Sequence, residues 1–155
     1  MSDSPWLSET QQAFWRSWLV LSARLPAALH RQLAEESGLS LLDFDVLVQL
    51  TEAPEGRLRV TELARALTWE RSRASHHLTR MQGRGLVTKE ECADDRRGFF
   101  VVVTPEGRAA IDRAAPSHAR TVKDLVFAGL GEDDLERLTR VVAGILARVD
   151  GHDRG

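Results

Sequence analysis

Ten consecutive residues in the middle of the chain carry side chains suited to hydrogen bonding with a polar partner. The segment from Arg71 to Arg80 reads RSRASHHLTR, so hydroxyl and imidazole groups lie among guanidinium groups. Short polar and basic side chains of these types can enter the major groove of DNA and hydrogen-bond to base edges. On a helix, one polar face would consist of Arg73, His76, Thr79 and Arg80, flanked by Ser72, Ser75 and His77.

A second basic group follows in the turn sequence ADDRRG, where Arg96 and Arg97 are adjacent. Cations in such a turn suit the narrow minor groove of DNA, where the negative potential is enhanced. The neighbouring Asp94 and Asp95 are acidic, so we expect them to orient the arginines or to form the turn.

Other chemistry finds less support in the sequence. Adjacent helical residues point about 100° apart, so His76 and His77 do not easily bind one metal ion, and no metal site is predicted. Cys92 is interpreted as an ordinary strand cysteine, with a redox-sensing thiol as the alternative. We find no phosphate loop, no nucleophile with partners at a recognisable spacing and no cofactor motif, which argues against an enzyme.

The polar segment is predicted to lie on a helix from about Glu70 to Gln82. Ala74, Leu78 and Met81 recur at helical spacing and form its buried stripe. A shorter helix precedes it, with Thr61 as the expected N-cap after a short strand at 58–60. The runs LVTKEEC and FFVVVT flank the ADDRRG turn and predict a β-hairpin.

Longer helices are predicted on both sides of this central segment. Residues 11–36 show a stripe of apolar side chains at spacings of three and four, with a kink expected at Pro26. Ser40 is expected to cap a further helix. Another helix should begin at Thr104-Pro105 and run to about Phe127, bent or broken near Pro116. The last, 132–149, has apolar residues at heptad-like spacing.

Composition fits a single globular domain. The chain has 155 residues, a net charge of −2 and one cysteine. Residues 57–108 hold eleven Lys and Arg against seven Asp and Glu, whereas the remainder holds ten against sixteen, so the middle is a basic island. No segment has the character of a membrane span or a secretion signal, and we expect a soluble, cytoplasmic protein.

Together these features resemble the MarR family of winged helix-turn-helix regulators. The segment DDRRGFFVVVTPEG, residues 94–107, resembles the wing signature of that family, and TELARALTWERSRASHHLTRMQGRGLV, residues 61–87, resembles its two central helices. The resemblance implies a mainly α fold with a small β-hairpin wing (α+β). The winged lobe would span about 57–104, and helices at about 8–37 and 105–150 would serve dimerisation.

The resemblance also implies partners and residue roles. It implies a homodimeric repressor on double-stranded DNA with a palindromic operator, released by a small-molecule effector that is phenolic or aromatic. The recognition-helix contacts would be Ser72, Arg73, Ser75, His76, His77, Thr79 and Arg80, with Arg96 and Arg97 on the wing. Trp15, Trp18 and His30 would line an effector cleft, or pack in the core or dimer interface instead. A winged-helix module that contacts proteins rather than operators is the alternative function.

Overall fold

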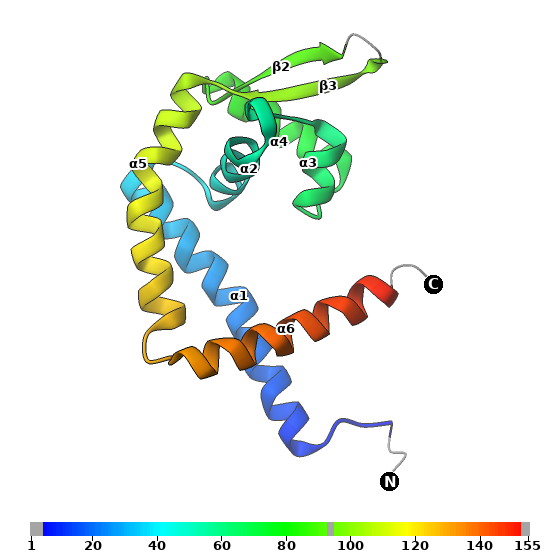
Figure 1. Ribbon diagram of the computed structural model, residues 1–155, viewed down its shortest axis with the longest axis vertical. Helices are drawn as coiled ribbons and strands as arrows, with labels where there is room; N and C mark the ends of the chain where they lie inside the picture. Colours follow the sequence, from blue (N-terminus) through cyan, green and yellow to red (C-terminus); the bar gives the residue numbers. More distant parts are fainter. Residues whose placement is uncertain (1–4, 93–94, 153–155) are drawn as a thin grey trace. The chain divides into compact units, whose positions relative to one another are not determined.

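The computed structural model describes residues 5–92 and 95–152, without the side chains of residues 92–97. Its elements, drawn in Figure 1, are α1 (Glu9–Ser37), α2 (Leu41–Glu52), the 3₁₀ turn η1 (Pro54–Gly56), β1 (Arg57–Arg59), α3 (Val60–Ala66), α4 (Arg71–Gly83), β2 (Val87–Cys92), β3 (Asp95–Val103), α5 (Pro105–Val122), the π-helical turn η2 (Lys123–Phe127) and α6 (Glu132–His152). The chain divides into two compact units, Met1–Thr121 and Val122–Gly155.

A three-stranded antiparallel sheet and the α3–α4 pair form the centre of the first unit. The strand order is β1-β3-β2, and β2 and β3 pair as the hairpin that the sequence predicts. Leu58 of β1 pairs with Val101 of β3, which ties the segment before α3 to the sheet. Figure 1 shows β2 and β3 as a two-stranded ribbon that extends beyond the helices. The architecture is mainly helical with a small wing, as the sequence predicts.

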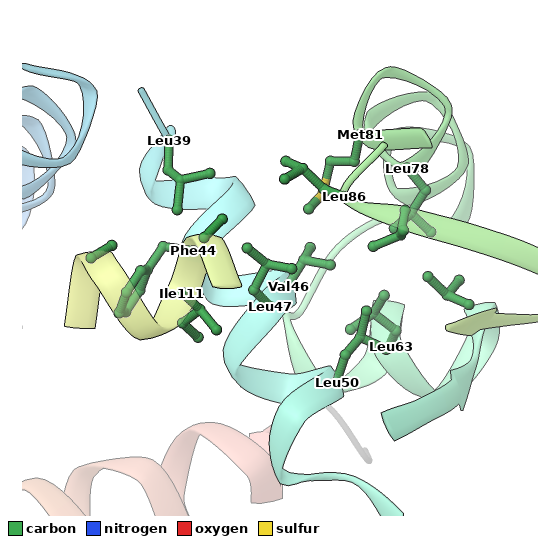
Figure 2. Packing of buried hydrophobic residues seen from close by; sticks show 14 of the residues in the cluster. Leu39, Phe44, Val46, Leu47, Leu50, Leu63, Leu78, Met81, Leu86 and Ile111 are labelled. Carbon is green, nitrogen blue, oxygen red and sulfur yellow. The ribbon is translucent and has the colours of Figure 1, made fainter. Parts of the chain in front are cut away.

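The core lies where α2, α4, the sheet and the start of α5 meet (Figure 2). Val46, Leu47 and Leu50 of α2 have no exposed surface, and neither do Leu78 and Met81 of α4. The buried stripe that the sequence predicts for α4 is therefore confirmed, since Ala74 is fully buried too. Burial of this kind contributes about 1.5–3 kcal/mol for each large apolar side chain, and it holds α4 with its other face outward.

The junction between β3 and α5 is held by the side chain of Thr104. Its Oγ1 donates to the Gly85 carbonyl oxygen at 2.6 Å and accepts from the Gly107 N–H at 2.9 Å, so it caps α5 as the sequence predicts. Gly107 is buried, and a Cβ there would overlap the Leu86 carbonyl oxygen. The Thr-x-x-Gly spacing thus lets the first turn of α5 contact the segment that follows α4.

The structure differs from the sequence predictions at several helix positions. Of the bend or break predicted near Pro116, the break does not occur, because α5 continues through the proline, and α1 likewise continues through Pro26. Helix α3 begins at Val60, so Arg59 and not Thr61 is its N-cap residue. The Glu62 carboxylate accepts the Arg59 N–H at 3.0 Å, which satisfies this backbone donor at the start of the helix. Across residues 5–92 and 95–152, every helix is too short or too polar to cross a membrane.

Candidate nucleic-acid interface

Helix α4 presents one buried face and one exposed polar face. It begins after Glu70, whose side chain makes no capping hydrogen bond, and ends in the turn at Gly83–Gly85. Six of the seven side chains that the sequence singles out on this helix are exposed together: Ser72, Arg73, Ser75, His76, Thr79 and Arg80. This face therefore combines hydroxyl, imidazole and guanidinium groups on a rigid element.

His77 departs from the sequence prediction. Its side chain is only 7% exposed and lies among the core residues of α4, so it does not share the outer face with His76. Its ring Nε2 lies 3.0 Å from Oδ1 of Asp43 on α2. The spacing from Ala74 to His77 is i to i+3, which already puts His77 on the buried stripe. We therefore withdraw His77 from the set of base contacts.

Asp43 is the centre of a buried polar network that sequence reasoning missed. Arg84, just after α4, donates to Asp43 Oδ2 at 2.6 Å and to the Gly38 carbonyl oxygen at 2.8 Å. The Ser40 N–H donates to the same carboxylate at 2.9 Å, and Ser40 Oγ accepts from the Asp43 N–H. The Ser-x-x-Asp spacing at 40–43 signals the capping box. The contacts across forty residues carry no such local signal.

This network sets the charge of Asp43. Burial acts to raise the pKa of the Asp43 carboxyl, but the contacts with His77, the Ser40 backbone, Arg84 and the Ser40 hydroxyl outweigh it and hold the pKa well below its usual range. Asp43 is thus a carboxylate in the folded protein. A buried charge with this many donors links α2, the α1–α2 corner and α4.

We expect Asp43→Asn to lower the free energy of unfolding by about 1–2 kcal/mol at pH 7, because it removes the charge and replaces one accepting oxygen with an NH2 group that faces other donors. A folded-state pKa below the unfolded value of about 3.9 stabilises the fold above that pH, and the contribution is lost as the pH falls further. Urea unfolding at pH 7 and pH 3 should show the difference between variant and wild type shrinking on acidification.

Asp45→Asn is the matched control, with the opposite sign. Burial raises the pKa of the Asp45 carboxyl, although the charge of His118 acts against this, so ionised Asp45 costs stability at neutral pH. We expect the Asp45 variant to be at least as stable as wild type at pH 7. Equal losses for both variants, or a loss at Asp43 that does not change with pH, would contradict the assignment.

Two arginines of the exposed face are held by neighbouring rings. The Arg73 guanidinium carbon lies 5.6 Å from the centre of the Trp69 ring, within the range of a cation–π contact. The Trp69 and His77 rings form a T-shaped pair, with ring centres 5.4 Å apart. Arg80 Nη2 donates to His77 Nδ1 at 3.1 Å. Trp69 is therefore a packing residue that also positions a cation.

Three further cations border a hollow between the start of α4 and the base of the wing. Arg59, Arg71 and Lys89 line it together with Ser75 and Phe99, and its volume is about 420 Å³. Lys89 Nζ also donates to Thr79 Oγ1 at 3.1 Å, which ties β2 to α4. Sequence reasoning missed these cations because they come from three separate elements. A positively lined hollow beside a polar helix face suits the phosphate backbone of DNA.

Not every predicted site residue can be placed. Asp94 and the side chains of Asp95, Arg96, Arg97 and Cys92 lie outside the described residues, although β3 begins at Asp95.

Of the three residues predicted to line an effector cleft, Trp15 and Trp18 lie one turn apart on α1, and His30 lies farther along the helix. Trp15 borders a hollow of about 610 Å³ that is lined by Leu7, Thr10, Gln11 and Phe14, and Trp18 packs near Phe14 with ring centres 6.0 Å apart. His30 lies at the other end of the helix, where its Nδ1 accepts the Leu41 N–H at 3.3 Å. Fifteen helical residues span about 22 Å. Within one chain, His30 and Trp15 therefore do not meet in one cleft.

Comparisons with known proteins agree with this geometry. Residues 37–98 match the sequence model of the MarR family. Sco3205 of Streptomyces coelicolor, a MarR family transcriptional regulator solved in complex with DNA, is 35% identical, with 92% of this chain and 90% of that chain covered and a TM-score of 0.88. AbsC, a MarR family transcriptional regulator of the same organism, is 34% identical, with 96% and 99% covered and a TM-score of 0.90. The HTH-type transcriptional repressor YetL of Bacillus subtilis is 23% identical over 112 residues, which span 72% of this chain and 66% of YetL.

Proposed function

The chain belongs to the MarR family of winged-helix transcriptional regulators, and from this premise we propose that it is a homodimeric repressor that leaves a palindromic operator when a small molecule binds. It is a DNA-binding regulator and not an enzyme. One observation carries the proposal: the exposed face of α4 gathers six hydrogen-bonding side chains next to a hollow lined by three cations.

The arrangement fits a helix in the major groove. Ser72, Arg73, Ser75 and His76 are near the start of α4, the part of a recognition helix that meets base edges in helix-turn-helix proteins. Thr79 and Arg80, one turn further on, are assigned to phosphates or bases. Arg59, Arg71 and Lys89 are placed to neutralise backbone phosphates beside the groove. Arg96 and Arg97, oriented by Asp94 and Asp95, are proposed to reach the minor groove.

Association into a homodimer is supported by apolar side chains that stay exposed on both flanking helices. They include Phe14, Trp15, Leu19 and Leu21 of α1 and Leu138, Val142, Leu146 and Val149 of α6. Several large apolar side chains that stay exposed on one helix are typical of an interface. We therefore assign residues 57–104 to the DNA-reading lobe and about 8–37 and 105–150 to dimerisation. Two lobes related by a two-fold axis would read half-sites about 34–36 Å apart.

Response to a small molecule is the remaining part of the proposal. Aromatic side chains at the apolar hollow of α1, Trp15 and Phe14, suit an aromatic or phenolic ligand. Such a ligand would weaken DNA binding by stabilising a lobe spacing that does not match the two half-sites. DNA affinity measured with and without a hydroxybenzoate probe examines this part separately.

Selection from a pool of random duplexes tests the function. We expect the full-length protein to enrich one inverted repeat, and two protomers to bind each enriched duplex in analytical ultracentrifugation. The enriched duplex should bind at least about 10³-fold more tightly than a random duplex of equal length at moderate salt.

Two outcomes would contradict the proposal. Failure to enrich any sequence would argue for a winged-helix module that contacts proteins, and the acidic flanks of the basic island would then be the surface to examine. Enrichment of a single half-site bound by one protomer would support sequence-specific DNA binding but contradict the proposed homodimer.

A further inference from the structure

His77 and Asp43 form a buried pair. Neither side chain reaches the surface, so neither can contact a DNA base. Their side chains are 7% and 3% exposed, and Nε2 of His77 lies 3.0 Å from Oδ1 of Asp43. An apolar residue at position 77 would match the rest of the buried stripe. A buried ionisable pair costs desolvation and gives little net stability over apolar packing. Packing alone therefore does not account for a histidine at position 77.

The second ring nitrogen of His77 contacts Arg80, a residue of the exposed face of α4. Arg80 Nη2 lies 3.1 Å from His77 Nδ1, and a guanidinium group can only donate. Nδ1 must therefore accept, which leaves the ring proton on Nε2, the nitrogen that lies 3.0 Å from Asp43 Oδ1 without a well-aligned hydrogen bond. The negative charge of Asp43 beside Nε2 favours the ring tautomer that can hold Arg80.

The hold on Arg80 leaves most of its guanidinium free. The group has five N–H donors, and the contact with His77 uses one edge of it. Arg80 is exposed on the outer face of α4, so the other donors remain available to a phosphate or a base. An arginine side chain loses rotamer entropy when it is fixed. Fixing it before DNA arrives removes that cost from binding.

We infer that His77 is a positioning residue of the DNA interface: anchored by Asp43, it orients Arg80 directly. The same ring is roughly perpendicular to the Trp69 ring, over which Arg73 lies. Because Asp43 also contacts Ser40 and Arg84, the orientation of Arg80 is fixed relative to the α1–α2 corner. This inference rests on the proposed DNA-binding function and adds a residue to it that makes no DNA contact.

Two substitutions separate the two contacts of the ring. His77→Gln keeps an N–H donor within reach of Asp43 but lacks an acceptor at the position of Nδ1. His77→Asn offers an oxygen near that position and does not reach Asp43. We expect His77→Gln to weaken binding to the selected duplex about tenfold. Its melting temperature should be closer to that of wild type than the melting temperature of His77→Asn. We expect His77→Asn to melt lower and, at a temperature where it is folded, to bind within about threefold of wild type.

A double-mutant cycle with Arg80→Ala gives the decisive measurement. If His77 acts through Arg80, the double variant His77→Gln/Arg80→Ala binds no more weakly than Arg80→Ala alone. His152→Gln, the same change at an exposed position near the end of α6, is the matched control and should bind as wild type. Affinities are measured by fluorescence anisotropy with the selected duplex and with a random duplex, at a temperature where circular dichroism shows each variant folded.

The outcomes are distinct. Multiplicative losses in the cycle, or a loss of affinity that follows the melting temperature across the two His77 variants, would overturn the positioning role while DNA binding by wild type stands. Failure of wild type to prefer any duplex would overturn the proposed function, and the inference would fall with it.

Discussion

Replacing Arg73 with alanine should reduce affinity for the selected duplex by about tenfold to a hundredfold, the largest loss we expect from one side chain of the interface. Arg73 is exposed near the start of α4, and its guanidinium lies over the Trp69 ring, 5.6 Å from its centre. A bidentate arginine contact with guanine discriminates between bases by about 1–3 kcal/mol. Anisotropy titrations with the selected duplex and with single-position variants of it measure this loss.

The comparison with Arg71→Ala distinguishes base reading from charge. Arg71 borders the cationic hollow, so its removal should weaken the selected and random duplexes alike and lower the salt slope of binding by about 1. Arg73→Ala should instead reduce the ratio between the two duplexes and relax the requirement at one base position. If both variants lower affinity for the two duplexes equally, Arg73 reads no base.

Gly107→Ala should destabilise the first unit by about 3 kcal/mol, although the change adds only one methyl group. Gly107 is buried in the first turn of α5, where a Cβ would overlap the Leu86 carbonyl oxygen and lie 3.2 Å from Leu47 Cδ2. The first of these is backbone, so either α5 or the turn after α4 has to move. Urea unfolding monitored by tryptophan fluorescence measures the change in the free energy of unfolding.

Gly144→Ala is the matched control for that substitution. Gly144 also lies inside a helix, but a Cβ there would meet only Arg148 Nη1, at 3.6 Å. Because alanine favours a helix over glycine by about 1 kcal/mol, the control should be neutral or stabilising. A Gly107 variant as stable as wild type would show that the packing at the start of α5 is looser than the structure indicates.

The sequence predicted those parts of the fold that depend on local periodicity. The stripe of Ala74, Leu78 and Met81 placed α4 and its outer face correctly, and the runs of β-branched and aromatic residues around ADDRRG predicted the wing hairpin. The same helical geometry that argued against a shared metal ion at His76 and His77 also places these residues on different faces. His77 could therefore have been assigned to the core from its spacing to Ala74.

The remaining features depend on contacts between distant segments. Arg84 donates to Asp43, which lies forty-one residues earlier in the sequence. The hollow at the wing base is lined by Arg59, Arg71 and Lys89, which come from three elements. The periodicity of the sequence does not predict these contacts, because they form only when the core packs the separate elements together. At Pro116 the sequence left a bend or a break open; α5 is continuous through the proline, and Ala110, Ile111 and Ala114 of the same helix pack in the core.

Thr104 gives the protein a mechanical property. Its hydroxyl and backbone bind the carbonyl groups of Gly85 and Leu86, just beyond α4, while the residue itself ends β3 and begins α5. Helix α4, the wing hairpin and α5 are therefore joined at one residue. In the proposed regulator, a movement of α5 would reach α4 through this contact without rearranging the polar face of α4.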